Sequence, residues 1–189
     1  MVTSGPDKEV LNLILGFSQA LETREGHLQS FCRHGIQVAG WLKGEFLGFL
    51  DEQKRQGKII DFEREEKLLS DKRKRVDFRL ALKTETGTRV AWIEIKHWLI
   101  GQQNSVTYDP SFYFGDPSSA GVNQDVRKLA IVQNEGKYLL VLATANPGDE
   151  EWQRGVTKFN KKFDPFHLET LNRPADFPDC FYLGLLKVS

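Results

Sequence analysis

One segment, RVDFRLALKTETGTRVAWIEIKHW (residues 75–98), limits the folds open to this chain more than any other, because it is typical of a β-hairpin with charged residues at its centre. Both halves alternate apolar and other residues, and Gly87 supplies the positive φ that the turn between them requires. Side chains along a strand point alternately to the two faces of a sheet. Glu94 and Lys96 therefore share one face with Trp92, and the residues between them form an apolar face suited to a core.

Three charged residues meet at the centre of this hairpin, since Asp77 lies on its first strand and Glu94 and Lys96 on its second. Burying such charges is costly unless they are paired or hold a metal ion. A structural ion pair of Glu94 with Lys96 or Arg79 is the alternative explanation, but it does not account for three charges on one face. The hairpin therefore indicates a functional site. His97 belongs to the opposite face and is more typical of a packed histidine than of a catalytic base.

The composition favours one domain spanning residues 1–189, because a chain with 40% hydrophobic residues can bury one ample core. Lys plus Arg equals Asp plus Glu at 26 each, and a net charge of zero neither requires nor excludes nucleic acid. Cys32 and Cys180 are far apart, which favours free thiols in a reducing compartment. With no signal-peptide pattern and no run near the ~18 apolar residues of a membrane span, we expect a soluble, cytoplasmic protein that does not enter a membrane.

Helices are predicted before the hairpin. Residues 9–22 form an amphipathic stripe that Asp7 is expected to cap and Gly26 to end. Residues 27–57 contain one or two further helices, the last of which stops at Gly57. Glycines inside a helix cost about 1 kcal/mol each relative to alanine, so close packing against a neighbour is expected where they recur. These glycines are Gly35, Gly40, Gly44 and Gly48.

A basic turn is predicted just before the hairpin. Residues 58–68 (KIIDFEREEKL) form an edge strand, because apolar residues are scarce after Phe62. A solvated turn is the commoner explanation of the cationic run that follows, and contact with phosphates is the functional alternative. The run consists of Lys72, Arg73, Lys74 and Arg75.

The remainder of the chain alternates helical and extended patterns. Residues 99–121, rich in Gly, Pro, Ser and aromatic residues, exceed an ordinary loop, which is typical of a functional or disordered segment. Residues 122–135 predict a helix, and the apolar run 137–145 predicts a central strand covered on both faces. A charged helix (148–163) and a strand (180–188) complete the chain.

The order of elements from residue 36 to 145 is helix, three strands, helix and strand, which is typical of the α/β and α+β classes. This order, with Asp77 on the second strand and Glu94-Ile95-Lys96 on the third, resembles the PD-(D/E)XK nuclease superfamily. The match covers about 110 of the 189 residues, and Val76 stands where the family has proline. The resemblance implies a restriction-endonuclease-like core: a central mixed β-sheet flanked by helices in the order αβββαβ, extended here by an N-terminal helix and a C-terminal helix and strand.

The chemistry of phosphodiester hydrolysis fits these residues. Mg²⁺ activates a water and neutralises the phosphoryl oxygens, and it takes a few carboxylates together with water and substrate oxygens. Asp77 and Glu94 supply that pair, and Lys96, ~6–7 Å along the strand from Glu94, would orient the nucleophilic water or stabilise the developing charge. Mn²⁺ is expected to substitute for Mg²⁺. By resemblance, the backbone carbonyl of Ile95 is a further ligand.

The resemblance also implies a carboxylate from the preceding helix. Glu45 lies at the edge of that helix's apolar arc, near Trp41, and is expected to complete the metal ligands. Glu52 is its rival two turns on, nearer the end of the helix. An exposed flank is the alternative explanation for either residue.

A Mg²⁺-dependent nuclease is therefore the predicted function, with DNA the expected substrate. The basic turn would contact the nucleic acid, and the resemblance adds Gln124 or Lys128 on the following helix. A homodimer would cut both strands of a duplex and is left open. One alternative is a catalytically silent nucleic-acid-binding or protein-assembly module on the same fold. Another is a protein-interaction domain that uses the aromatic segment Tyr108 to Phe114.

Overall fold

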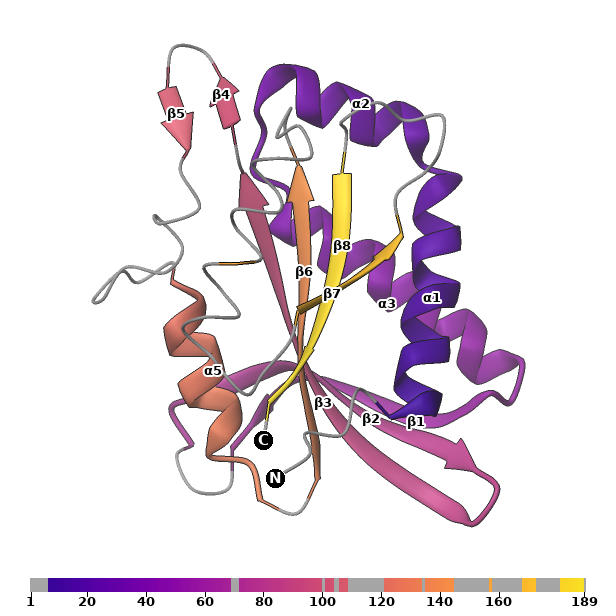
Figure 1. Cartoon of the computed structure of the whole chain (residues 1–189). Coiled ribbons are helices and arrows are strands. Elements are labelled where there is room, and N and C mark those ends of the chain that lie inside the picture. The colour runs from indigo at the N-terminus through magenta and orange to yellow at the C-terminus, as the bar shows by residue number, and fades with distance from the viewer. Residues whose placement is uncertain are drawn as a thin grey trace.

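The protein has an α+β architecture, a six-stranded mixed sheet with helices on both faces (Figure 1). No helix in the part of the chain that the structure describes is long and apolar enough to cross a membrane. The computed structural model describes residues 7–68, 72–99, 101–103, 106–108, 121–133, 135–144, 157, 168–172 and 181–188.

Three helices precede the sheet: α1 (Lys8–Glu22), α2 (Glu25–His34) and α3 (Ala39–Arg55). Gly57 follows α3 with a φ of 70°, as predicted for a helix stop. The prediction for Gly26 is wrong, because this residue lies inside α2.

Asp7 occupies the N-cap position of α1, but its side chain makes no capping hydrogen bond. The predicted cap is therefore wrong. Tyr138, Arg89 and Lys187 contact the Asp7 carboxylate instead. Three donors, two of them cationic, outweigh the local backbone amides as partners for this carboxylate.

The large sheet has the strand order β1-β2-β3-β6-β8-β7. β2 and β3 form the predicted antiparallel hairpin, and β6 runs parallel to β3 after the crossover through helix α5 (Val122–Ala130). The strands of this large sheet are β1 (Ile59–Lys67), β2 (Arg75–Thr84), β3 (Gly87–Leu99), β6 (Gly136–Thr144), β7 (Leu168–Asn172) and β8 (Phe181–Lys187). The predicted order of elements between residues 36 and 145, the edge position of β1 and the central position of β6 are confirmed.

Two short strands lie in the segment predicted to be a long loop. β4 (Gly101–Gln103) and β5 (Val106–Tyr108) pair antiparallel as a separate two-stranded sheet. The aromatic residues at 112–114 and the predicted helix at 148–163, apart from residue 157, lie outside the described residues. β7 was not predicted.

Two apolar cores sandwich the sheet. The first lies between one sheet face and the helices α1, α2 and α3, and the second lies under α5 (Figure 1). Alternate residues of β6 serve the two cores, with Leu140 in the first and Leu139 and Val141 in the second. β3 divides in the same way: Ile93 and Ile95 enter the first core and Trp92 the second, as the alternation in the sequence predicts. The face that carries Glu94 and Lys96 is therefore the one that α5 covers.

Candidate functional site

The site lies where the hydrogen-bonded pairing between β2 and β3 ends. The paired register of the two strands ends at Phe78 and Ile93, one residue short of Asp77 and Glu94. Beyond that point side chains take over the backbone partners. The Ile95 N–H donates to Oδ2 of Asp77 at 2.8 Å, and the Asp77 N–H donates to Oε2 of Glu94 at 3.3 Å. The two carboxylates thus take the place of backbone carbonyls as acceptors for these N–H groups at the end of the hairpin. These hydrogen bonds help to offset the cost of burying the two acids.

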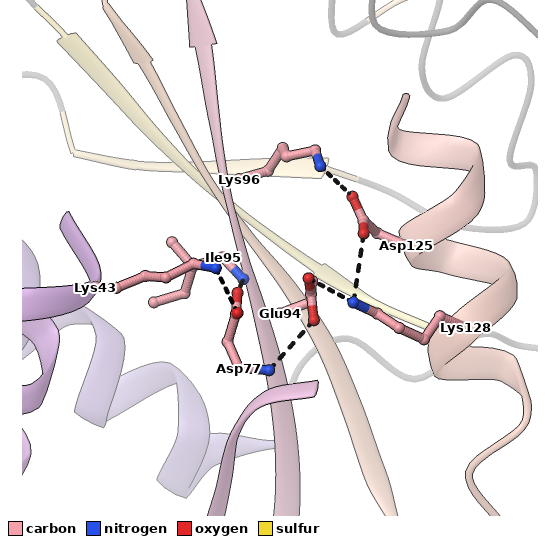
Figure 2. A network of polar contacts seen from close by, with 7 residues as sticks. All are labelled: Lys43, Asp77, Glu94, Ile95, Lys96, Asp125 and Lys128. Carbon is pink, nitrogen blue, oxygen red and sulfur yellow. Dashed lines mark hydrogen bonds and ion pairs between the residues drawn. The ribbon is translucent and has the colours of Figure 1, made fainter. Parts of the chain in front are cut away.

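Helix α5 brings two further charged residues to this point. Lys128 Nζ lies 2.6 Å from Oε1 of Glu94 and 3.6 Å from Oδ1 of Asp125. Lys96 Nζ lies 2.7 Å from Oδ2 of the same Asp125. Asp125 therefore ties Lys96 on the strand to Lys128 on the helix, as Figure 2 shows.

A third lysine enters from the opposite side of β3. Lys43 Nζ, on α3, lies 2.5 Å from Oδ1 of Asp77 (Figure 2). Glu45, two residues further along α3, is turned about 200° around the helix axis from Lys43. Its carboxylate forms an ion pair with Arg24 at 3.1 Å. The structure therefore does not bring Glu45 to Asp77, and the α3 residue that reaches the site is a cation rather than the predicted carboxylate.

Glu52, the rival of Glu45, lies outside the site as well. Its carboxylate pairs with Arg55 and accepts a hydrogen bond from Gln56, both within the last turns of α3 and the residue that follows it. These contacts match the exposed flank that was the alternative explanation.

The network is electrically balanced. Among the described residues it contains three carboxylates (Asp77, Glu94 and Asp125) and three lysines (Lys43, Lys96 and Lys128), and each acid has at least one lysine partner. The acid side chains are 6–9% exposed, whereas the lysine side chains are 18–32% exposed. An approaching anion would therefore meet ammonium groups before carboxylates.

Burial perturbs the ionisation of this cluster. Burial and the neighbouring charge of Asp77 raise the pKa of the Glu94 carboxyl to about 7, despite its contact with Lys128. For Lys43, burial lowers the pKa, but the hydrogen bond to Asp77 outweighs it and the pKa lies above its ordinary value. The negative charges of Asp77 and Glu94 repel each other, and a bound cation would reduce that repulsion.

Asp77 and Glu94 offer carboxylate oxygens, the ligand type that Mg²⁺ and Mn²⁺ take in proteins. Within the described part of the chain, no three His, Cys, Asp or Glu side chains cluster as a metal cage would require. Mg²⁺ does not need such a cage, because one or two carboxylates suffice when phosphates and waters complete the octahedron. The N–H and C=O of one strand residue point to the same neighbour. Since the Ile95 N–H points to Asp77, the Ile95 carbonyl leaves β3 on that same edge.

The remaining predicted residues have mixed outcomes. Lys96 lies on the predicted face, and Lys128 contacts Glu94 directly. Gln124 is exposed on α5, where its buried neighbour Asp125 joins the network instead. The basic turn, Lys72 to Arg75, is exposed immediately before Asp77.

Sequence reasoning missed Lys43 and Asp125. The spacing of Asp125 and Lys128, three residues apart on one helix, was a signal for a paired acid and base. Lys43 offered no comparable signal, because its position depends on how α3 lies against the sheet.

His97 is the packed histidine that the sequence predicts. It is 4% exposed, and its Nδ1 lies 3.3 Å from the backbone nitrogen of Val38 and 2.7 Å from the side-chain oxygen Oε1 of Gln37. Burial lowers the pKa of His97 to about 4. A neutral ring therefore joins β3 to the start of α3, on the sheet face opposite Lys96.

Comparison with known proteins finds no match to this chain among family models, curated proteins or solved structures. The geometry of the charged network therefore carries the argument for function.

Proposed function

We propose that this protein is a metal-dependent nuclease that hydrolyses phosphodiester bonds, with DNA as its substrate, on a fold of the PD-(D/E)XK type. The observation that carries the proposal is the pair of buried carboxylates, Asp77 and Glu94, at the point where the pairing of β2 with β3 ends. The order of elements supports it, since helix, three antiparallel strands, helix and a strand parallel to the third is the mixed arrangement that the resemblance implies.

Each residue of the site has a chemical task in this proposal. Asp77, Glu94 and the Ile95 carbonyl would hold Mg²⁺, which supplies an activated water and neutralises the phosphoryl oxygens when bound. Lys96 would orient the attacking water and stabilise charge that develops on the phosphate. The exposed basic turn, Lys72 to Arg75, would contact neighbouring phosphates along the strand. Glu45 has no role here, because its carboxylate pairs with Arg24.

A catalytically silent nucleic-acid-binding module is the second candidate. The observation that favours it is the balanced network, in which every carboxylate already has a lysine partner. A structural ionic cluster would be balanced in the same way.

Cleavage assays separate these candidates. The purified protein is incubated with labelled single- and double-stranded DNA and with RNA, in Mg²⁺, Mn²⁺ or EDTA. We expect metal-dependent cleavage that falls about 100-fold or more in Glu94→Gln and in Lys96→Met, since each removes a group acting on the reacting atoms. Two exposed positions on the same hairpin provide matched controls, Glu85→Gln and Lys83→Met, which should cleave like the wild type.

Three results would count against the nuclease. Cleavage that persists in EDTA, or equally in Glu94→Gln, would come from a contaminant. Binding of DNA without cleavage under any of these metals would favour the silent module.

A further inference from the structure

Both oxygens of each central carboxylate already have a donor. Asp77 accepts the Ile95 N–H on Oδ2 and the Lys43 ammonium on Oδ1. Glu94 accepts the Asp77 N–H on Oε2 and the Lys128 ammonium on Oε1. The backbone donors are held by the strands, whereas a lysine side chain has four rotatable bonds and can move its ammonium by changing rotamer. A metal ion that binds Asp77 must therefore displace Lys43 or share its oxygen.

The charge of the network makes that displacement costly without an anion. With all six groups ionised, three acids and three lysines sum to zero, so a divalent ion added alone would leave a net charge of +2 in a largely buried cluster. Uncompensated charge of this kind is strongly disfavoured away from water. Phosphate groups that arrive with the metal would restore the balance and give the displaced ammonium groups new partners.

Lys43 is the lysine best able to make this exchange. Its side chain is 32% exposed, more than those of Lys96 at 22% and Lys128 at 18%. The helix surface beside it carries little side-chain cover, because Gly40, one turn earlier, and Gly44, the next residue, are exposed and have open space where a Cβ would be. No side chain at Gly40 or Gly44 would hinder a phosphate backbone that approaches this part of α3.

We propose that Lys43 is a built-in counter-ion that keeps divalent metal off Asp77 until a nucleic-acid phosphate draws its ammonium away, so that metal and nucleic acid bind cooperatively. This proposal rests on the nuclease function proposed above. It makes metal binding weak in the free protein and strong in the complex with substrate, and linkage requires that the metal strengthen nucleic-acid binding by the same factor.

Mn²⁺ binding to the free protein tests the proposal directly. Affinity is measured by calorimetry and by the electron paramagnetic resonance of unbound Mn²⁺, with no nucleic acid present. Lys43→Met should bind Mn²⁺ about ten-fold tighter or more than the wild type, because the competing ammonium is gone. Lys54→Met is the matched control: Lys54 lies on the same helix and pairs with Asp61 at 2.6 Å, but both partners are exposed. It should bind Mn²⁺ like the wild type.

Two further variants keep the result interpretable. Asp77→Asn introduced into Lys43→Met should abolish the gain, which assigns it to this carboxylate. Lys43→Gln loses the charge but keeps a donor to Asp77, so it should fold well and show a similar gain. Mn²⁺ should also raise the melting temperature of Lys43→Met more than that of the wild type.

Cooperativity is measured by repeating the Mn²⁺ titration with a phosphorothioate oligodeoxynucleotide present. The oligonucleotide should increase the Mn²⁺ affinity of the wild type, and it should increase that of Lys43→Met much less. Equal Mn²⁺ affinity of the wild type and both Lys43 variants would overturn the proposal, and so would a gain that survives Asp77→Asn. If the wild type still cleaves DNA in that case, only the role of Lys43 fails. If the wild type neither cleaves DNA nor binds Mn²⁺ with the oligonucleotide present, the nuclease function fails with it.

Discussion

At the scale of single residues, His97 is a buried group whose ionisation should be visible in stability. Its pKa is lowered to about 4 by burial, whereas an unfolded chain has a histidine pKa of about 6.5. Because the folded pKa is the lower one, the unfolded state takes up a proton first as the pH falls. The stability that neutral His97 contributes is therefore complete above pH ~6.5 and is lost progressively down to pH ~4.

We expect the stability advantage of the wild type over His97→Gln to shrink by about 2 kcal/mol between pH 7 and pH 5. The comparison with the variant is needed because Glu94, whose pKa is raised to about 7, titrates in the same range with the opposite sign. Its contribution is the same in both proteins and cancels. Urea denaturation at the two pH values measures the difference, and an advantage that does not change with pH would contradict a neutral buried ring.

At the scale of elements, α3 carries glycines that the sequence predicted to be packed against a neighbour. For Gly40, Gly44 and Gly48 that prediction is wrong: they are exposed, and a Cβ at any of them would meet no atom within 4 Å. Nothing in the described packing requires glycine there. The three glycines therefore destabilise the helix, and no close contact with a neighbour compensates for this.

Gly44→Ala should accordingly raise the free energy of unfolding by about 0.5–1 kcal/mol, because alanine loses less backbone entropy in a helix. Gly57→Ala, just beyond the same helix, should lower it by about 1 kcal/mol, because an L side chain disfavours positive φ, and Gly57 has a φ of 70°. Chemical denaturation of both variants checks the pair. Destabilisation by Gly44→Ala would mean that something covers this face.

At the scale of the whole molecule, Asp7 joins segments that are distant in sequence. Its carboxylate accepts the Tyr138 hydroxyl at 2.6 Å and lies 2.8 Å from Arg89 and 3.1 Å from Lys187. The start of α1 is thereby tied to β3, β6 and β8. Burial raises the pKa of Asp7, but the hydrogen bonds from Tyr138, Lys187 and Arg89 outweigh it and the pKa lies below its ordinary value.

Asp7→Asn should lower the free energy of unfolding by about 1–2 kcal/mol at pH 7, since charged hydrogen bonds become neutral ones at a partly exposed site. The folded pKa is the lower one, so this stability is present above pH ~4 and is lost as the pH falls through the folded pKa. The difference from the wild type should therefore shrink as the pH falls below ~4 in thermal or urea unfolding. Asp61→Asn, which removes an exposed carboxylate paired with Lys54, is the control and should change stability little.

The periodicity of the sequence determined the hairpin, its two faces, the edge position of β1 and the central position of β6. It also determined that Asp77 and Glu94 would meet and that Lys96 would share the face of Glu94. Neighbouring strands joined by a short turn have their register set by that turn and by the period of two. These are local rules, and a local pattern is sufficient to apply them.

Tertiary structure alone decided which helix residues join those three. Lys43 reaches Asp77 and Glu45 does not, although both flank the apolar face of α3. Asp125 enters the site and Gln124 stays exposed on α5, although they are adjacent in sequence. A helix pattern indicates which face is buried, but the axial position and tilt of the helix on the sheet follow from the packing of two whole cores. A rotation of one residue step, 100°, would exchange Asp125 for Gln124, and a rotation of two steps would exchange Lys43 for Glu45. Only the packed molecule sets these angles.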